Sequence, residues 1–244
     1  MHANAKIYIS LVSAAGIAAM AYAFLDLQWS GDPLRFCAYF LLSLVAAAMK
    51  LRLPGLTETM SIGFVLVLLG IAELTLPETM LMASAGVVVQ CIWRVNRRPA
   101  AVQVLFSVSA VAISLVLAFE ASQLVRLRFH AESVSIALAV ATCLYFVANS
   151  LLVSGVVSVV RREPLRAIWQ QCYLFAFPYF LLGGAIAGLM AAAEHDFGWK
   201  PALLILPVMG MVFLFYRLYI ARLEILPAAA VAAASLHTVK TRSA

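Results

Sequence analysis

The sequence predicts an all-α fold, a polytopic bundle of about eight transmembrane helices with both termini in the cytoplasm. Composition is the first observation behind this prediction. Of the 244 residues, 65% are hydrophobic and 11% are charged, and the mean hydropathy is +1.01. A water-soluble domain of this composition would leave far too much apolar surface uncovered. The chain is therefore expected to lie in a membrane.

Recurring apolar runs are the second observation. Each is close to the roughly 17 to 25 residues that cross a hydrocarbon core about 30 Å thick as a helix. Backbone polar groups cannot stay unpaired in lipid, and the runs lack the alternation of barrel strands, so helices are expected. In chain order, the predicted spans are Ile7–Leu25, Leu34–Met49, Met60–Leu76, Glu78–Trp93, Ala100–Ala121, Ser133–Val160, Cys172–Ala193 and Pro201–Ile220.

The distribution of basic residues is the third observation, and it predicts the orientation. With a cytoplasmic N-terminus, 13 of the 17 Lys and Arg residues fall inside and 4 outside. Cytoplasmic loops are enriched in such residues. The formal charge of +6 is explained by this topology, so no nucleic-acid partner is expected. The four outside residues are Arg35, Arg126, Arg128 and Lys200.

The first span has an alternative interpretation. Lys6, a short apolar run and the small-residue pattern Ala21, Tyr22, Ala23 also fit a cleaved signal peptide. Cleavage would leave seven spans and an external N-terminus, with the C-terminus still cytoplasmic.

The turn between the third and fourth spans contains two acids with different expected roles. Thr75 and Glu78 have the T-x-x-E spacing of a capping box, and Pro77 occupies an early helical position that needs no amide hydrogen. Glu78 is therefore predicted to cap the fourth helix. Glu73 precedes the turn by about one helical turn, roughly 5 Å below the external boundary. A carboxylate at that depth is costly unless paired or hydrated, so Glu73 is a ligand-binding candidate, or else it snorkels to the interface or is protonated against a neighbouring helix.

Further polar residues at depth complete the set of candidate ligand-binding residues. Glu120 and Gln123 end the fifth span on the outer side, near His130 and Glu132, and could share an external vestibule with Glu73. Closer to the cytoplasm, three amides could either bind a ligand or hydrogen-bond between helices. These amides are Gln90, Gln103 and Asn149.

No catalytic constellation, metal site or cofactor site is predicted. The cluster Glu194, His195 and Asp196 lies in the expected last external loop, where a lone histidine is more often solvated than metal-bound. Hydrolase, protease and nucleotide-binding motifs are absent from the sequence. The chain is therefore not expected to be an enzyme.

The segments around the seventh span carry signals for packing and for the membrane surface. Arg161 to Gln171 reads as a short interfacial helix. In the seventh span, Gly184 and Gly188 have the G-x-x-x-G spacing of close helix packing, and Pro178 is expected to loosen one backbone bond. The predicted organisation is one transmembrane domain, residues 1–224, followed by a short cytoplasmic tail, residues 225–244, with no output domain.

Several segments together resemble the N-terminal multi-span sensory module of bacterial HD-GYP and GGDEF signalling proteins. The similarity covers most of the chain from about residue 35 onward, although Ser107 stands where those proteins usually carry asparagine. The segments that carry it are "KLRLPGLTETMSIGFVLVLLGIAELTLPETMLMASAGVVVQCIWR" (50–94), "RRPAAVQVLFSVSAVAIS" (97–114), "YFVANSLLVS" (145–154), "YRLYIARLE" (216–224) and "SLHTVKT" (235–241).

This resemblance implies a sensory input domain of the bacterial inner membrane. Such a domain would bind a ligand and signal to a cytoplasmic enzyme that makes or degrades cyclic di-GMP. The expected partners are then the lipid bilayer, a small ligand, a cytoplasmic signalling enzyme and a second copy of the chain. Two alternatives stay open at this point: a small-solute permease or transporter subunit, and a scaffold that assembles through the Gly184 and Gly188 face.

Overall fold

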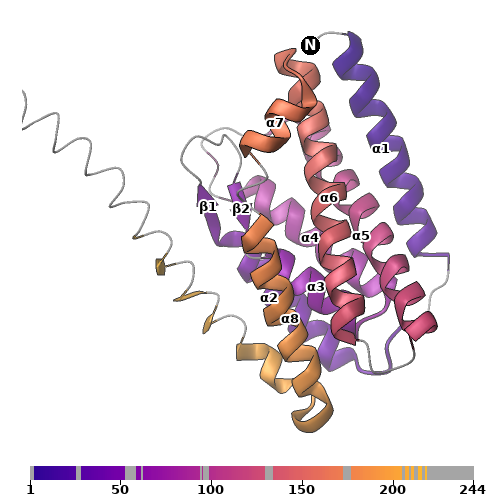
Figure 1. The fold of residues 1–244 in the computed structure, drawn as a ribbon, viewed down its shortest axis with the longest axis vertical. Coiled ribbons are helices and arrows are strands. Elements are labelled where there is room, and N and C mark those ends of the chain that lie inside the picture. The colour runs from indigo at the N-terminus through magenta and orange to yellow at the C-terminus, as the bar shows by residue number, and fades with distance from the viewer. Residues whose placement is uncertain are drawn as a thin grey trace, which may run out of the picture.

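A computed structural model describes residues 3–25, 29–52, 59–61, 63–93, 95, 99–129, 134–172 and 177–204, with a few more between 207 and 218. Across these residues the fold is helical apart from one small hairpin, which confirms the all-α class (Figure 1). In the described part of the chain, three helices are long and apolar enough to cross a membrane by length and composition. They are α1 (Ala3–Ala23), α5 (Ala101–Phe129) and α6 (Val134–Arg161).

The remaining helices are shorter, and most match a predicted span to within a few residues. Of the eighth predicted span, the described part begins as the 3-10 helix η3 (Lys200–Leu204). The predicted interfacial segment contains the eight-residue helix α7 (Leu165–Cys172). The other helices are α2 (Pro33–Ala48), α3 (Gly63–Glu73), α4 (Leu76–Ile92) and α8 (Phe177–Phe197).

The predicted third span, Met60 to Leu76, is wrong at its N-terminal end. Strands β1 (Lys50–Arg52) and β2 (Thr59–Ser61) pair antiparallel, with Lys50 opposite Ser61. The helix begins only at Gly63, so α3 has 11 residues and a length of about 16 Å, roughly half of a hydrocarbon core. The sequence Pro54-Gly55 is a turn signal, which a hydropathy run does not register.

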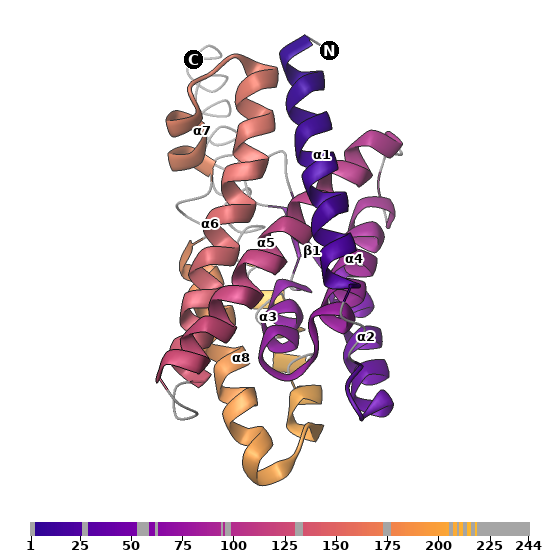
Figure 2. The same ribbon diagram turned by 90° about the vertical axis from the view of Figure 1, so that its right-hand side faces the viewer.

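Helix α3 is the buried centre of the bundle. Residues Phe64 to Ile71 are all buried, as expected for a helix that is apolar on every side. Helices α2, α4, α5, α6 and α8 all contact it. Figure 2 shows α1 beside α5, with α6 on the far side of α5, and α8 running along α3.

The outside of the bundle is apolar, and small residues lie where two of its helices pack closely. Large side chains such as Leu11, Leu117 and Leu189 are exposed, as expected where a surface faces lipid. Inside, a Cβ on Gly16 of α1 would lie 2.2 Å from the Ser109 Cβ of α5. Small residues therefore let these two helices approach closely.

Candidate functional site

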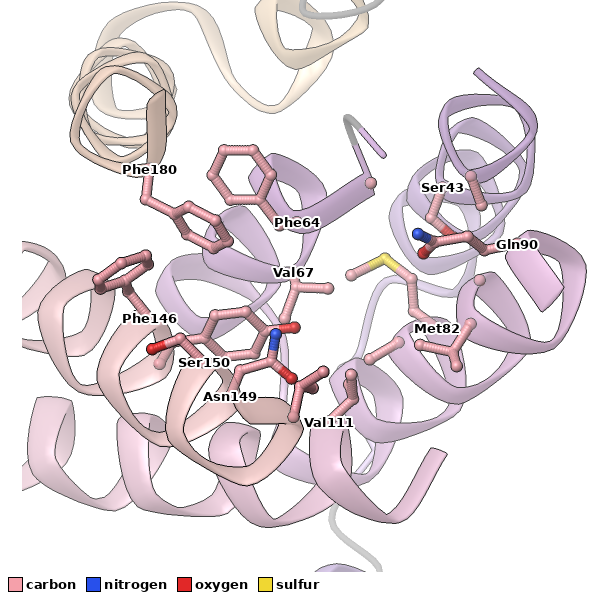
Figure 3. Close-up of a pocket in the computed structure, with 17 residues that line it drawn as sticks. Ser43, Phe64, Val67, Met82, Gln90, Val111, Phe146, Asn149, Ser150 and Phe180 are labelled. Atoms are coloured by element: carbon pink, nitrogen blue, oxygen red, sulfur yellow. The ribbon is translucent and has the colours of Figure 1, made fainter. Parts of the chain in front are cut away.

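A cavity of about 150 Å³ lies over the N-terminal end of α3. Its walls come from α2, α3, α4, α5, α6 and α8 (Figure 3). The lining is mostly apolar, and none of the described residues in it is charged. Its polar side chains are Ser43, Gln90, Tyr145, Asn149 and Ser150.

The short α3 helix explains why this space exists. Gly63, Phe64 and Val67, from the first turns of α3, line the cavity. Because α3 starts about halfway along the bundle, the described parts of its longer neighbours surround a volume that α3 does not fill. The cavity therefore lies in the half of the bundle where α2, α4 and α6 end.

Three phenylalanines from three helices form one wall of the cavity. The Phe180 ring of α8 lies 4.3 Å from the Phe64 ring of α3 and 5.0 Å from the Phe146 ring of α6, between centroids. Figure 3 shows these rings gathered on one side. Sequence reasoning missed this wall, because isolated phenylalanines in apolar runs do not reveal which helices become neighbours.

Two of the predicted amides face one another across this space. Gln90 comes from α4 and Asn149 from α6, and both amides reach toward the cavity in Figure 3. Among the residues that the structure describes, none hydrogen-bonds the Asn149 side chain. The structure thus brings these two candidates into one site, although the sequence placed them only at similar depth.

A hydrogen bond links the cavity to α7. The Trp169 indole Nε1 donates to Ser150 Oγ at 2.9 Å, and Ser150 Oγ donates to the Val147 carbonyl at 3.2 Å. Ile168 beside Trp169 is buried as well. Helix α7 is therefore attached to a residue of the cavity wall.

At the opposite end of the bundle, Glu78 forms a buried cap. Its Oε2 accepts hydrogen bonds from Thr75 N at 3.1 Å and Thr75 Oγ1 at 2.9 Å, within a capping box. Its Oε1 accepts from Ser30 N at 3.0 Å and from Ser30 Oγ. Glu78 is 1% exposed, so its carboxylate is satisfied inside the protein and is not available as an open ligand site.

Glu73 is held by its neighbours near the same end. The Tyr39 hydroxyl of α2 donates to its carboxylate. Arg126 donates to the Ala72 carbonyl at 3.0 Å, which places a cation at the C-terminal end of α3, where the helix dipole favours it. The Trp199 ring stands edge-on to Tyr39, with centroids 6.4 Å apart.

The other predicted ligand residues lie outside the cavity. Gln103 Oε1 accepts from Ala100 N at 3.0 Å and so caps the start of α5. Glu120 accepts from the Tyr22 hydroxyl of α1 at 3.0 Å in an exposed position, and Gln123 is half-buried on α5. The expected vestibule partners His130 and Glu132 fall outside the described residues.

The cluster expected in the last external loop is part of a helix instead. Glu194, His195 and Asp196 belong to the last turn of α8 rather than to a loop. Across the described residues, no group of three His, Cys, Asp or Glu side chains could hold a metal ion.

The glycines of α8 pack unequally. A Cβ on Gly184 would lie 2.6 Å from Thr142 Oγ1 of α6, whereas a Cβ on Gly188 would meet Leu138 at an ordinary 3.6 Å. A Cβ on Gly183 would lie 2.4 Å from the Phe64 ring. The close approach is thus at Gly183 and Gly184. Pro178 lies in the first described turn of α8, directly after residues that the structure does not describe, so the expected loosening of one backbone bond stays a prediction.

Comparison with known proteins places the chain in a family. No curated protein and no solved structure gives a match. The family model MASE9, which describes membrane-associated sensory domains, matches residues 14–182, and all the described residues that line the cavity fall within this range. Because the match covers more than half of the chain, the protein belongs to the MASE9 family of membrane-associated sensory domains.

Proposed function

We propose that this domain is the signal-input module of a bacterial cyclic di-GMP signalling system. It binds a small ligand within the bundle, and binding shifts the packing of its helices. A cytoplasmic output domain or partner enzyme then reads that shift. The family match over residues 14–182 carries this proposal, and the resemblance of residues 50–94 and 216–224 to HD-GYP and GGDEF input modules supports the choice of output.

The proposed topology has eight spans, with both termini on the cytoplasmic side of the inner membrane. The start of α1, the end of α6 and α7 lie at one end of the bundle (Figures 1 and 2). Exposed cations gather there, namely Lys6, Arg161, Arg162 and Arg166. Such clustering supports a cytoplasmic location for this end. Arg126, at the other end, hydrogen-bonds the end of α3 and so has a structural reason to lie there.

The route from cavity to output runs through α7 and α8 in this proposal. Ser150 holds Trp169 of α7, and Phe180 of α8 packs in the aromatic wall. A change in cavity shape would therefore move α7 through its hydrogen bond to the wall and α8 through its own wall residue.

Co-purification with enzymatic activity tests this function. The tagged chain is isolated from membranes of its native cells and assayed for synthesis and hydrolysis of cyclic di-GMP. We expect one of these activities to co-purify and to change in Trp169→Phe, which removes the hydrogen bond to Ser150. The matched control is Trp29→Phe, because Trp29 is half exposed and is not among the residues that line the cavity.

Two results would contradict the proposal. One is the absence of any cyclic di-GMP activity from the native complex. The other is solute accumulation by proteoliposomes of the purified chain that is lost in Asn149→Ala or Glu73→Gln, which would favour a permease.

A further inference from the structure

We propose that the cavity over α3 is a binding site for a compact, uncharged, mainly apolar molecule with one hydrogen-bonding group, of the size and polarity of a simple phenol. The inference deepens the proposed sensory function and rests on it for its signalling consequence. The binding step itself stands on the cavity alone.

The volume limits the size of the ligand. A closed protein cavity of about 150 Å³ accepts a molecule as large as benzene. The volume here is also about 150 Å³, in a site that is partly open, so it has room for a single small ring. A larger ligand would have to separate the Phe146 and Phe180 rings, which now lie 5.0 Å apart.

The described lining disfavours a charged ligand. None of the described residues that line the cavity is Asp, Glu, Lys or Arg. An ion transferred from water into such a site loses its hydration without gaining a counter-ion, and it would be neutralised or rejected. The aromatic wall of Phe64, Phe146 and Phe180 instead favours a flat ring, by edge-to-face or offset contact.

The Asn149 amide explains why the ligand should carry one polar group. Asn149 reaches the cavity from α6, none of the described residues hydrogen-bonds its side chain, and an amide offers both a donor and an acceptor. The first turn of α3 also lines the cavity at Gly63 and Phe64, and N–H groups in a first turn lack intrahelical acceptors. A hydroxyl or carbonyl oxygen on the ligand would satisfy the Asn149 amide, which an all-hydrocarbon ligand would leave unpaired.

The same geometry connects ligand binding to α7. Ser150 follows Asn149 on α6 and accepts the hydrogen bond from the Trp169 indole. A ligand oxygen drawn to Asn149 therefore lies one residue from the contact that holds α7. Binding is expected to change the environment of Trp169 and not that of Trp29.

Binding of matched fluorinated probes tests the inference. The full chain in lipid nanodiscs is titrated with 4-fluorophenol, 4-fluorotoluene and 4-fluorobenzoate, and ¹⁹F NMR measures saturable binding after subtraction of partition into empty nanodiscs. We expect the phenol to bind most tightly, the toluene more weakly and the benzoate not at all.

Three variants locate the site. Gly86→Val fills the cavity, since a Cβ there meets only the Ala47 Cβ, at 3.8 Å, and it should weaken both neutral probes by about tenfold or more. Asn149→Leu keeps the volume but removes the amide, so it should weaken the phenol by about tenfold and the toluene by less than about twofold. Gln123→Leu removes an amide on α5 outside the cavity and should change neither.

The inference fails if the unaltered protein shows no saturable binding of either neutral probe, or if Gly86→Val and Asn149→Leu both bind them unchanged. That failure would leave the co-purified cyclic di-GMP activity untouched. Conversely, loss of that activity with intact probe binding would contradict the signalling function and leave the site in place.

Discussion

At the scale of single residues, the Glu78 carboxylate joins two parts of the chain. It accepts hydrogen bonds from Thr75, at the start of α4, and from Ser30, just before α2. A buried carboxylate with several donors is stabilising, and loss of a partner leaves buried polar groups unsatisfied. Glu78 thus links the beginnings of two helices through its contact with Ser30, which lies 48 residues earlier in the chain.

We expect Glu78→Gln to lower the free energy of unfolding by about 1–3 kcal/mol, because an amide cannot accept at both positions. The measurement is thermal unfolding of the purified protein in detergent. Glu120→Gln is the matched control, since its bond to Tyr22 is exposed, and it should leave the midpoint unchanged. Equal midpoints for the two variants would contradict the capping role.

The Tyr39 and Glu73 pair makes a second residue-scale prediction. Tyr39 is fully buried and its hydroxyl donates to Glu73. Tyr39→Phe should therefore cost about 1–2 kcal/mol of stability, and it should cost much less in a Glu73→Leu background. Additive effects in this double-mutant cycle would show that the pair does not interact.

At the scale of secondary-structure elements, α8 packs closely at the adjacent glycines Gly183 and Gly184, and not at both glycines of the G-x-x-x-G motif. The sequence motif pairs Gly184 with Gly188, but the close contacts belong to Gly183 and Gly184, because the former faces Phe64 of α3 and the latter Thr142 of α6. A motif gives the spacing of small residues along a helix. It does not give the rotation of that helix against its neighbours.

This difference predicts opposite effects of two alanines on one helix. Gly184→Ala should lower the thermal midpoint, by about 1–3 kcal/mol of stability, because its Cβ would overlap the Thr142 side chain. Gly188→Ala meets only an ordinary contact and gains helix propensity, so it should be neutral or stabilising by up to about 1 kcal/mol. Destabilisation by Gly188→Ala alone would contradict the packing described.

Hydrophobic runs in the sequence predicted most of the helices well, but they placed the start of the third helix too early. Length and apolar content alone identify α1, α5 and α6, and the T-x-x-E spacing identifies the start of α4. The run Met60 to Leu76 looks continuous, but it joins a strand to a short helix, because hydropathy does not distinguish a buried strand from a helical turn. Only part of the candidate site could be predicted from the sequence. The depth of a residue along a helix can be read from its position in the apolar run. The direction in which Gln103 or Glu120 points around its helix depends on the neighbouring helices, which the sequence does not give.

At the scale of the whole molecule, the arrangement of the helices makes the proposed topology directly testable. Gly31 precedes α2 at one end, where a Cβ would meet no atom within 4 Å, and Arg166 is exposed on α7 at the other. In a chain whose four cysteines are replaced, Gly31→Cys should react with a membrane-impermeant maleimide on intact cells lacking an outer-membrane barrier. Arg166→Cys should react only after permeabilisation. The reverse pattern would invert the proposed orientation.

The length of α3 has a consequence for how this protein is made. Eleven residues are too few to hold a segment across the bilayer on their own, so the insertion machinery cannot release α3 into lipid as an independent span. The tight turn to α4 offers the solution, because the two helices can enter as one unit, with Glu78 already closing the turn. We expect α3 to remain beside the translocation channel until α4 has been synthesised, so that biogenesis, and not only folding, depends on that turn.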